Sequence, residues 1–253
     1  MRETAYAKLN LALHVRAREA DGYHRIETLF AFCEDGDAVT AEPAEALSLT
    51  VTGPFAEALA GEGDNLVLRA ARAVGAWSAI TLDKRLPVAT GLGGGSADAA
   101  AVLRLFGGTM EAAGTLGADV PACLLSRTAR GEGRGDEIEP VEIPGLTGTP
   151  VLLVNPDIPL TTAAVFRGWD GIDRGPLGLD WEAGRNDLES PARALVPAVG
   201  AVLESLSGAR LARMSGSGAT CFGLYDSEAD RDVDCERIKA RNPGWWLSQT
   251  RLR

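Results

Sequence analysis

The stretch of sequence best suited to hold a charged ligand runs from residue 87 to residue 98 and reads Pro-Val-Ala-Thr-Gly-Leu-Gly-Gly-Gly-Ser-Ala-Asp. Glycine fills four of the five positions from 91 to 95, so the backbone can turn with positive φ and carries no Cβ to obstruct a ligand. The apolar run 99–106 predicts a helix, with Ser96 as its N-cap and Asp98 in its first turn. Because a helix N-terminus presents unpaired N–H groups and a partial positive charge, we expect phosphate to bind here. The alternative is a flexible turn before a helix.

The glycine-rich segment does not match the two common phosphate-binding fingerprints. No Gly-x-x-x-x-Gly-Lys-Ser/Thr sequence is present, and Ser96 stands where a Gly-x-Gly-x-x-Gly motif needs its third glycine. The segment therefore predicts a phosphate loop of another class.

Polar residues alternate with apolar ones near the start of the chain. Leucine and valine occupy every second position from Leu9 to Val15, which predicts a half-buried strand. Lys8 and Asn10 then share the other face, about 7 Å apart at a rise of roughly 3.3 Å per residue. Taken alone, Lys8 has the alternative of an ordinary solvated lysine.

A turn at Asp21-Gly22 places an aromatic ring beside an imidazole. Tyr23 and His24 can stack on a flat heterocycle and hydrogen-bond to its edge. The same pair can also simply begin the next strand, residues 26–32.

Two further charged residues stand at positions where chemistry and structure compete as explanations. Asp119 lies two residues before Pro121, so it is either a helix N-cap or a reactive carboxylate. Lys84 interrupts an apolar row in the predicted strand 79–86, where it either extends to solvent or meets a nucleotide bound by the glycine segment.

The remaining pattern predicts an α+β fold of two domains, residues 1–147 and 148–253. In the first, Asp64-Asn65 caps a helix expected from residue 66 to about 77. In the second, the elements follow the order β-α-α-β-β-α-β, which is a ferredoxin-like layout.

Composition excludes several classes of function. The net charge of -10 argues against a nucleic acid or an anionic membrane as partner. The four cysteines are widely scattered and only two histidines are present, so no zinc site is expected. No signal-peptide or membrane-spanning run is evident, and we expect a cytoplasmic protein.

Taken together, separated blocks of the sequence resemble the GHMP small-molecule kinases. The glycine segment 87–96 is similar to their ATP signature, and 7–10, 21–24 and 116–121 resemble the branch that phosphorylates a cytidyl diphosphate derivative of methylerythritol. Two more family landmarks are 186–189 and 215–219. The resemblance implies an N-terminal ATP-binding domain, a C-terminal ferredoxin-like domain and an active site in the cleft between them. It also implies transfer of the ATP γ-phosphoryl group to the substrate 2-hydroxyl in non-mevalonate isoprenoid synthesis.

The resemblance assigns a role to individual residues. Asp119 is implied as the general base and Lys8 as its partner, while Tyr23 and Phe166 would flank cytosine and His24 would read its edge. The substrate contacts that the resemblance implies are Asn10, Tyr23, His24, Thr162 and Phe166. The nucleotide contacts that it implies are Asn65, Lys84, Pro87, Gly91, Leu92, Gly93, Gly94, Gly95, Ser96 and Ala97. No protein metal ligand is expected, and Mg²⁺ would arrive with ATP.

The sequence departs from the family pattern in two places. The segment 107–115 is short, which predicts a trimmed helix, and Phe166 stands where many members have tyrosine. Two other functions remain open: a GHMP kinase for another alcohol, such as homoserine or mevalonate, and a nucleotide-binding regulator without catalysis. The oligomeric state, monomer or homodimer, is equally open.

Overall fold

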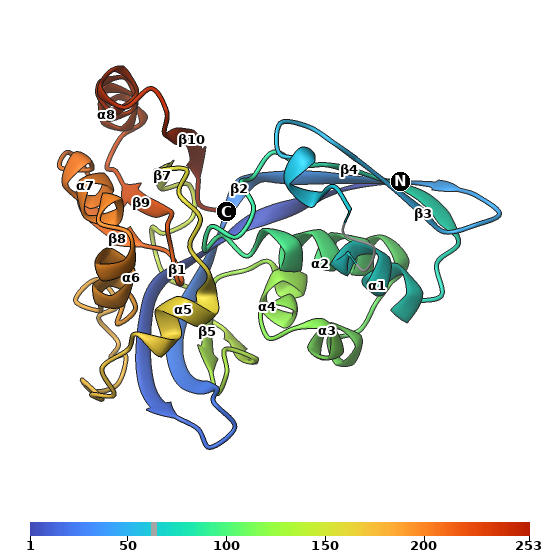
Figure 1. The fold of residues 1–253 in the computed structure, drawn as a ribbon, viewed down its shortest axis with the longest axis horizontal. Coiled ribbons are helices and arrows are strands. Elements are labelled where there is room, and N and C mark those ends of the chain that lie inside the picture. Colours follow the sequence, from blue (N-terminus) through green and yellow to red (C-terminus); the bar gives the residue numbers. More distant parts are fainter. Residues whose placement is uncertain (62–64) are drawn as a thin grey trace.

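Two long strands run through the centre of the molecule. We describe them from a computed structural model of residues 1–61 and 65–253, so the predicted cap Asp64 lies outside the described residues. Strands β1 (Arg2–Arg18) and β2 (His24–Pro43) pair antiparallel and form the hairpin at the bottom of Figure 1. In the described residues they belong to a six-stranded sheet in which the order is β3-β4-β2-β5-β6 and β1 pairs with β2. The other strands are β3 (Ser48–Thr52), β4 (Ser78–Asp83), β5 (Ala129–Glu132) and β6 (Glu137–Pro140).

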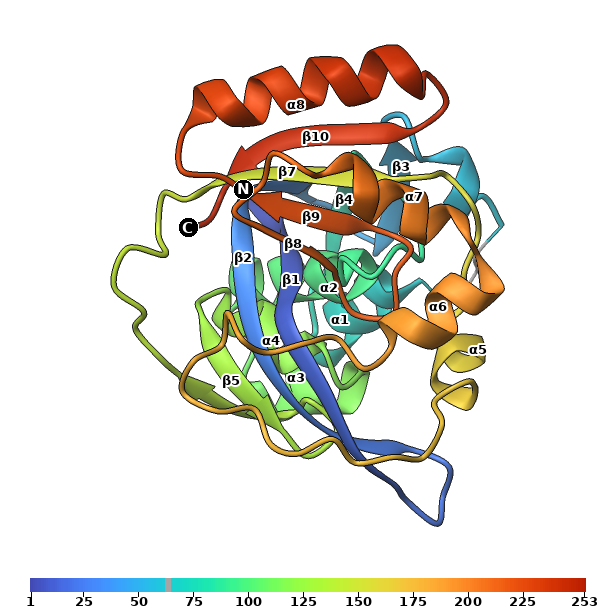
Figure 2. The ribbon, with the colours of Figure 1, turned by 90° about the vertical axis from the view of Figure 1, so that its left-hand side faces the viewer.

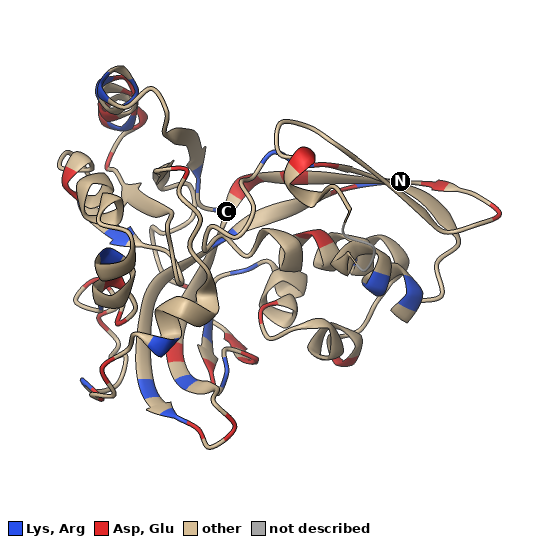
Figure 3. Cartoon of the chain, in the orientation of Figure 1, with Lys and Arg blue, Asp and Glu red and all other residues tan. Residues whose placement is uncertain are grey.

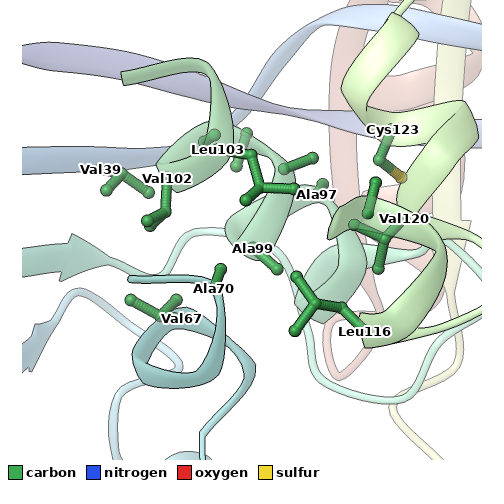
Figure 4. Close-up of a cluster of buried hydrophobic side chains, with 14 of the residues drawn as sticks. Val39, Val67, Ala70, Ala97, Ala99, Val102, Leu103, Leu116, Val120 and Cys123 are labelled. Carbon is green, nitrogen blue, oxygen red and sulfur yellow. The ribbon is translucent and has the colours of Figure 1, made fainter. Parts of the chain in front are cut away.

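Four helices pack against this sheet and against one another (Figure 1). They are α1 (Leu66–Ala73), α2 (Gly94–Phe106), α3 (Met110–Leu116) and α4 (Val120–Leu125). Helix α2 lies at the centre of the cluster, and its buried alanines let α1 and α4 approach closely (Figure 4). The seven-residue α3 occupies the segment that the sequence predicts to be trimmed. A short 3₁₀ turn, η1 (Glu57–Leu59), precedes α1.

The second half of the chain forms an antiparallel sheet of four strands, in the order β10-β7-β9-β8. Helices α7 and α8 lie beside this sheet, and α5 and α6 follow below α7 (Figure 2). The strands are β7 (Pro150–Asn155), β8 (Leu211–Met214), β9 (Cys221–Leu224) and β10 (Trp246–Arg251). The helices are α5 (Thr162–Arg167), α6 (Glu189–Leu195), α7 (Ala198–Ser205) and α8 (Glu228–Arg241). This arrangement confirms the α+β class and the ferredoxin-like layout, except that three helices rather than the predicted two lie between β7 and β8.

Strand β1 is more deeply buried than the alternation predicts. Its leucines pack with β7 and β9. Lys8 lies against the glycine segment, Asn10 bonds to Lys8, and His14 contacts the loop 175–185, so these three polar side chains are buried as well. The prediction of a half-buried strand is therefore wrong, because protein covers both faces.

Two predicted helix boundaries also need correction. Helix α1 ends at Ala73 rather than near Trp77, whose side chain is 69% exposed. Helix α2 begins at Gly94 with Gly93 as N-cap, and Ser96 makes no cap bond but lies in the first turn. Among the described residues, no helix has the length and hydropathy needed to cross a bilayer.

Candidate active site

The structure brings Lys8 and Asp119 together although 111 positions separate them. Lys8 Nζ lies 3.0 Å from Asp119 Oδ2. Asp119 occupies the N-cap position of α4, yet its carboxylate caps nothing and pairs with the lysine. The side chain of Lys8 is 4% exposed, whereas that of Asp119 is 39% exposed. The arrangement therefore presents the carboxylate to a ligand and keeps the ammonium group behind it.

Asn10 fixes the lysine from the other side. Lys8 Nζ donates to Asn10 Oδ1 at 3.0 Å, and Asn10 Nδ2 donates to Thr28 Oγ1 at 2.8 Å. Thr28 in turn donates to Ala12 O at 2.6 Å. Because this chain of hydrogen bonds is buried, the ammonium group is held in one position.

The glycine segment lies directly over Lys8. The Lys8 N–H donates to Leu92 O at 2.9 Å, and a Cβ on Gly93 would lie 3.0 Å from Lys8 Cε. Gly93 has φ +63°, which turns the chain into α2 at this close approach. The first N–H groups of α2, at Gly94, Gly95 and Ser96, then have no acceptor within the helix. They lie about one turn earlier than the donors of a helix capped by Ser96 would, and they provide the kind of donors that the predicted anion site needs.

A loop from the second half of the chain supports the glycine segment. Ser215 Oγ donates to Gly91 O at 2.9 Å and accepts from the Asn10 N–H at 3.2 Å. Asn186 Nδ2 donates to the carbonyls of Met214 and Gly216, both at 2.8 Å. The two family landmarks 186–189 and 215–219 thus hold one another and the glycine segment.

Lys84 lies beneath the glycine segment and is neutralised by two carboxylates. Its Nζ is 2.5 Å from Asp37 Oδ2 and 2.9 Å from Asp98 Oδ2, and all three side chains are buried. Burial lowers the pKa of Lys84, but the charges of Asp98 and Asp37 outweigh it and leave that pKa raised. Burial raises the pKa of Asp98 to about 7 against the opposing charge of Lys84. A Cβ on Gly94 would lie 3.0 Å from Lys84 Nζ, so the lysine supports the start of α2 from below.

A cavity of about 760 Å³ extends from the glycine segment to the β1–β2 hairpin. At its far end the His24 ring lies 4.9 Å from the Phe166 ring and 5.7 Å from the Trp169 ring, between centroids. Burial and the nearby Arg18 charge lower the pKa of His24, and Arg18 Nε donates to His24 Nε2 at 3.1 Å. The imidazole is therefore neutral near pH 7, with Nδ1–H as its free donor.

Most of the residues that the sequence nominates share this cavity. Those lining it are Lys8, Asn10, Tyr23, His24, Gly91, Gly93, Gly94, Gly95, Ser96, Asp119, Thr162 and Phe166. Five others lie behind the lining and are buried: Asn65, Lys84, Pro87, Leu92 and Ala97. Of these, Asn65 caps α1, with Oδ1 accepting from the Val67 N–H at 2.9 Å.

Sequence reasoning missed several residues that hold the site. Thr28 precedes the apolar run 29–33 and Asp37 follows it within the acidic stretch 34–37, so neither stood out in the sequence although both side chains are buried. Arg134, in the turn between β5 and β6, also lines the cavity. The glycines around Arg134 marked a turn but gave no indication of what the turn faces.

Comparison with known proteins gives one consistent family. The model of the GHMP kinases N terminal domain matches residues 65–127, and that of the GHMP kinases C terminal matches residues 177–244. A 4-diphosphocytidyl-2-C-methyl-D-erythritol kinase of Rhizorhabdus wittichii is 56% identical over 277 residues, covering 99% of this chain and 94% of the relative. The kinase of the same name from Sphingopyxis alaskensis is 50% identical and covers 100% of this chain and 99% of its own.

Solved structures agree with the sequence relatives. A crystal structure of 4-(cytidine 5'-diphospho)-2C-methyl-D-erythritol kinase superposes with a TM-score of 0.81 at 34% identity, over 99% of both chains. The mevalonate kinase of Methanococcus jannaschii shares the fold, with a TM-score of 0.68 at 11% identity over 100% of this chain and 98% of its own. The chain is thus a small-molecule kinase of the GHMP fold and belongs to the family of 4-diphosphocytidyl-2-C-methyl-D-erythritol kinases.

Proposed function

We propose that this protein transfers the γ-phosphoryl group of ATP to the 2-hydroxyl of 4-diphosphocytidyl-2-C-methyl-D-erythritol, a step of non-mevalonate isoprenoid precursor synthesis. The observation that carries the proposal is the pairing of Lys8 with Asp119 at 3.0 Å in a cavity shared with the N-terminus of α2. Relatives of that name cover almost the whole chain at 50% identity or more, which supports this substrate over another alcohol.

The nucleotide triphosphate would lie at the start of α2. The N–H groups of Gly94, Gly95 and Ser96 provide donors for phosphate oxygens, and the helix dipole favours their charge. Mg²⁺ commonly binds substrate phosphates together with one or two carboxylates. No group of three or more potential metal ligands occurs among the described residues, so phosphate oxygens would provide most of its coordination.

Asp119 and Lys8 would act at the reacting hydroxyl. Asp119 accepts the proton of the substrate 2-hydroxyl. The hydroxyl oxygen forms a bond to the γ-phosphorus while the bond from that phosphorus to the β-phosphate oxygen breaks in line, which releases ADP. Lys8 stabilises the negative charge on the transferring group and holds the Asp119 carboxylate in place through their ion pair. Asn10 maintains this orientation through its bond to Lys8.

The cytidine would occupy the aromatic end of the cavity. Tyr23 and Phe166 offer stacking surfaces, and the neutral His24 offers Nδ1–H to an acceptor on the base edge. Thr162, which shares a hydrogen bond of 2.9 Å with Ser217, lines the same region.

We also propose that the two domains meet at residues 147 and 148, between the two sheets, and that the protein acts in the cytoplasm. The four cysteines, Cys33, Cys123, Cys221 and Cys235, are free and buried, as suits a reducing compartment.

The test is a coupled ADP-release assay with ATP and Mg²⁺. We expect turnover with the cytidylated methylerythritol and none above background with homoserine or mevalonate. Selective turnover of either of those alcohols would contradict the proposed substrate. Tight ATP binding with no transfer to any of the three would instead support a regulator without catalysis.

A further inference from the structure

The turn between β5 and β6 meets the β1–β2 hairpin at the mouth of the cavity, and both turns carry acidic and basic positions (Figure 3). We infer that Arg134, in the first of these turns, is a specificity-determining residue that binds the diphosphate of the substrate, with Asp21 holding it in place beforehand. This role rests on the proposed function, and the diphosphate is the group that distinguishes the proposed substrate from simpler alcohols.

Arg134 stacks on the ring of Tyr23, which is one of the predicted substrate contacts. Its guanidinium carbon lies 4.0 Å from the centroid of the Tyr23 ring, and the guanidinium group forms an ion pair with Asp21. All three residues line the cavity that contains Asp119. Arg134 covers one face of the ring, which orients Tyr23 as a platform and leaves the other face for a base.

The backbone holds the two turns in register. The Ile26 N–H donates to Gly133 O at 2.8 Å, and the Tyr23 N–H donates to Asp21 Oδ1 at 3.1 Å. That N–H group, together with the charge of Arg134, holds the pKa of the Asp21 carboxyl below its ordinary value. The guanidinium and the carboxylate are therefore both charged at neutral pH.

The charges around the cavity single out Arg134. Of the described residues that line it, Lys8 and Arg134 are the cationic side chains that carry a fixed charge. Lys8 is buried and bonded to Asp119 and Asn10, whereas the side chain of Arg134 is 43% exposed. Arg134 is therefore the cation of the described lining that is open to the diphosphate of a cytidine stacked on Tyr23.

Substrate binding would exchange one anion for another. An exposed ion pair such as Arg134–Asp21 contributes little to stability, so its replacement is easy. A guanidinium group forms two parallel N–H bonds with a phosphate as it does with a carboxylate, but the diphosphate carries more negative charge than Asp21 and is held in place by the stacked base. A ligand without the diphosphate lacks the group that displaces Asp21.

The test compares the affinities of CDP and cytidine by titration calorimetry, for wild type and four variants. Wild type should bind CDP more tightly. Arg134→Gln should reduce that preference by about 10-fold or more, the usual range for a charged hydrogen bond. Arg134→Lys should retain part of it, and Asp21→Asn should retain or increase it. Arg130→Gln is the matched control, because Arg130 in β5 donates to the carbonyls of Leu177 and Gly178 and does not line the cavity.

An unchanged CDP preference in Arg134→Gln would overturn the inference. Equal losses for CDP and cytidine would also overturn it, because they would limit Arg134 to orienting Tyr23. In turnover assays, Arg134→Gln should raise KM for the cytidylated substrate far more than it lowers kcat. A wild type that prefers CDP through Arg134 but transfers no phosphate would contradict the proposed function and support this role of Arg134.

Discussion

Asp98 and Asp119 both pair with a lysine, but their surroundings give them different tasks. Asp119 is partly exposed in the cavity and is available to a ligand. Asp98 is buried beneath the glycine segment, shares Lys84 with Asp37, and has no hydrogen-bond partner for Oδ1 among the described residues. A neutral carboxyl tolerates such a missing bond better than an ionised one.

The raised pKa of Asp98 predicts a pH-dependent stability. A carboxyl with a pKa of about 7 in the folded state and an ordinary value near 3.8 in the unfolded state binds more protons when folded between these values. The contribution of Asp98 to the free energy of unfolding is therefore fully present below pH 3.8. It is lost as the pH rises towards 7, by at most about 1.4 kcal/mol per pH unit. Asp98→Asn should remove this slope.

Urea denaturation of wild type and Asp98→Asn at pH 5, 6, 7 and 8 measures this pH dependence of the free energy of unfolding. The difference between the two proteins cancels the other titrating groups, including the two histidines, whose lowered pKa values act in the opposite direction. If the difference in free energy of unfolding between wild type and Asp98→Asn does not change between pH 5 and pH 7, Asp98 is ionised throughout that range.

At this scale the sequence supported the pairing of Lys8 with Asp119 only through family resemblance. Spacing gave no means of bringing together residues 111 positions apart. The prediction that Lys84 lies near the glycine segment was correct, but its carboxylate partners were not predicted. The register of β2 on β4 brings Asp37 to Lys84, and no local pattern encodes that register.

Helix α2 carries the N–H groups that we propose bind the nucleotide, and a glycine caps each of its ends. Gly93 and Gly107 have φ +63° and +71°, a region that costs other residues roughly 1–2 kcal/mol. A Cβ on Gly93 would also press on Lys8, whereas one on Gly107 would meet nothing within 4 Å.

Gly93→Ala and Gly107→Ala should therefore lose similar stability but differ in activity. We expect Gly93→Ala to lower kcat/KM at least about tenfold, since a shift of 1 Å in a catalytic group can cost about 10²-fold. Gly107→Ala should retain the wild-type value. Steady-state kinetics and thermal unfolding of both variants provide the comparison, and equal kcat/KM values would exclude a contact between Gly93 and Lys8 that matters for the reaction.

Local patterns predicted which elements exist better than where they end. The alternation from Leu9 to Val15 revealed β1 but not its 17-residue length or its burial on both faces. Helix α1 ends early because its cap at Val74 is followed by the left-handed Gly75, at φ +65°, a signal that the apolar stripe concealed.

At the scale of the whole molecule, one buried hydroxyl links the loop after β8 both to β1 and to the glycine segment. Ser215 is fully buried and joins Asn10 of β1 to Gly91 of the glycine segment. Ser215→Ala would leave that N–H and that carbonyl without this partner. We expect it to lower the free energy of unfolding by about 1–3 kcal/mol and to raise KM for ATP.

The control is Ser205→Ala, because the Ser205 hydroxyl donates only to Val202 O within α7. Its KM for ATP should match wild type. Chemical denaturation and nucleotide titration distinguish the variants, and an unaltered KM for ATP in Ser215→Ala would refute the proposed connection.

The overall architecture was predictable, since turn residues and periodicity indicated the succession of strands in the second half and all but one of the helices between them. The docking of residues 215–220 onto the glycine segment was not predictable, because it joins the Ser215 hydroxyl to the Gly91 carbonyl, 124 positions away. Contacts of this kind depend on how two complete sheets pack.

We propose that Asp119, held by Lys8, accepts the proton of the hydroxyl that attacks ATP. The decisive measurement is single-turnover formation of ADP by Asp119→Asn, with the enzyme in excess over the cytidylated substrate and ATP saturating. We expect a rate lower by roughly 10²–10⁴-fold with unchanged ATP affinity. A wild-type rate in Asp119→Asn would contradict it.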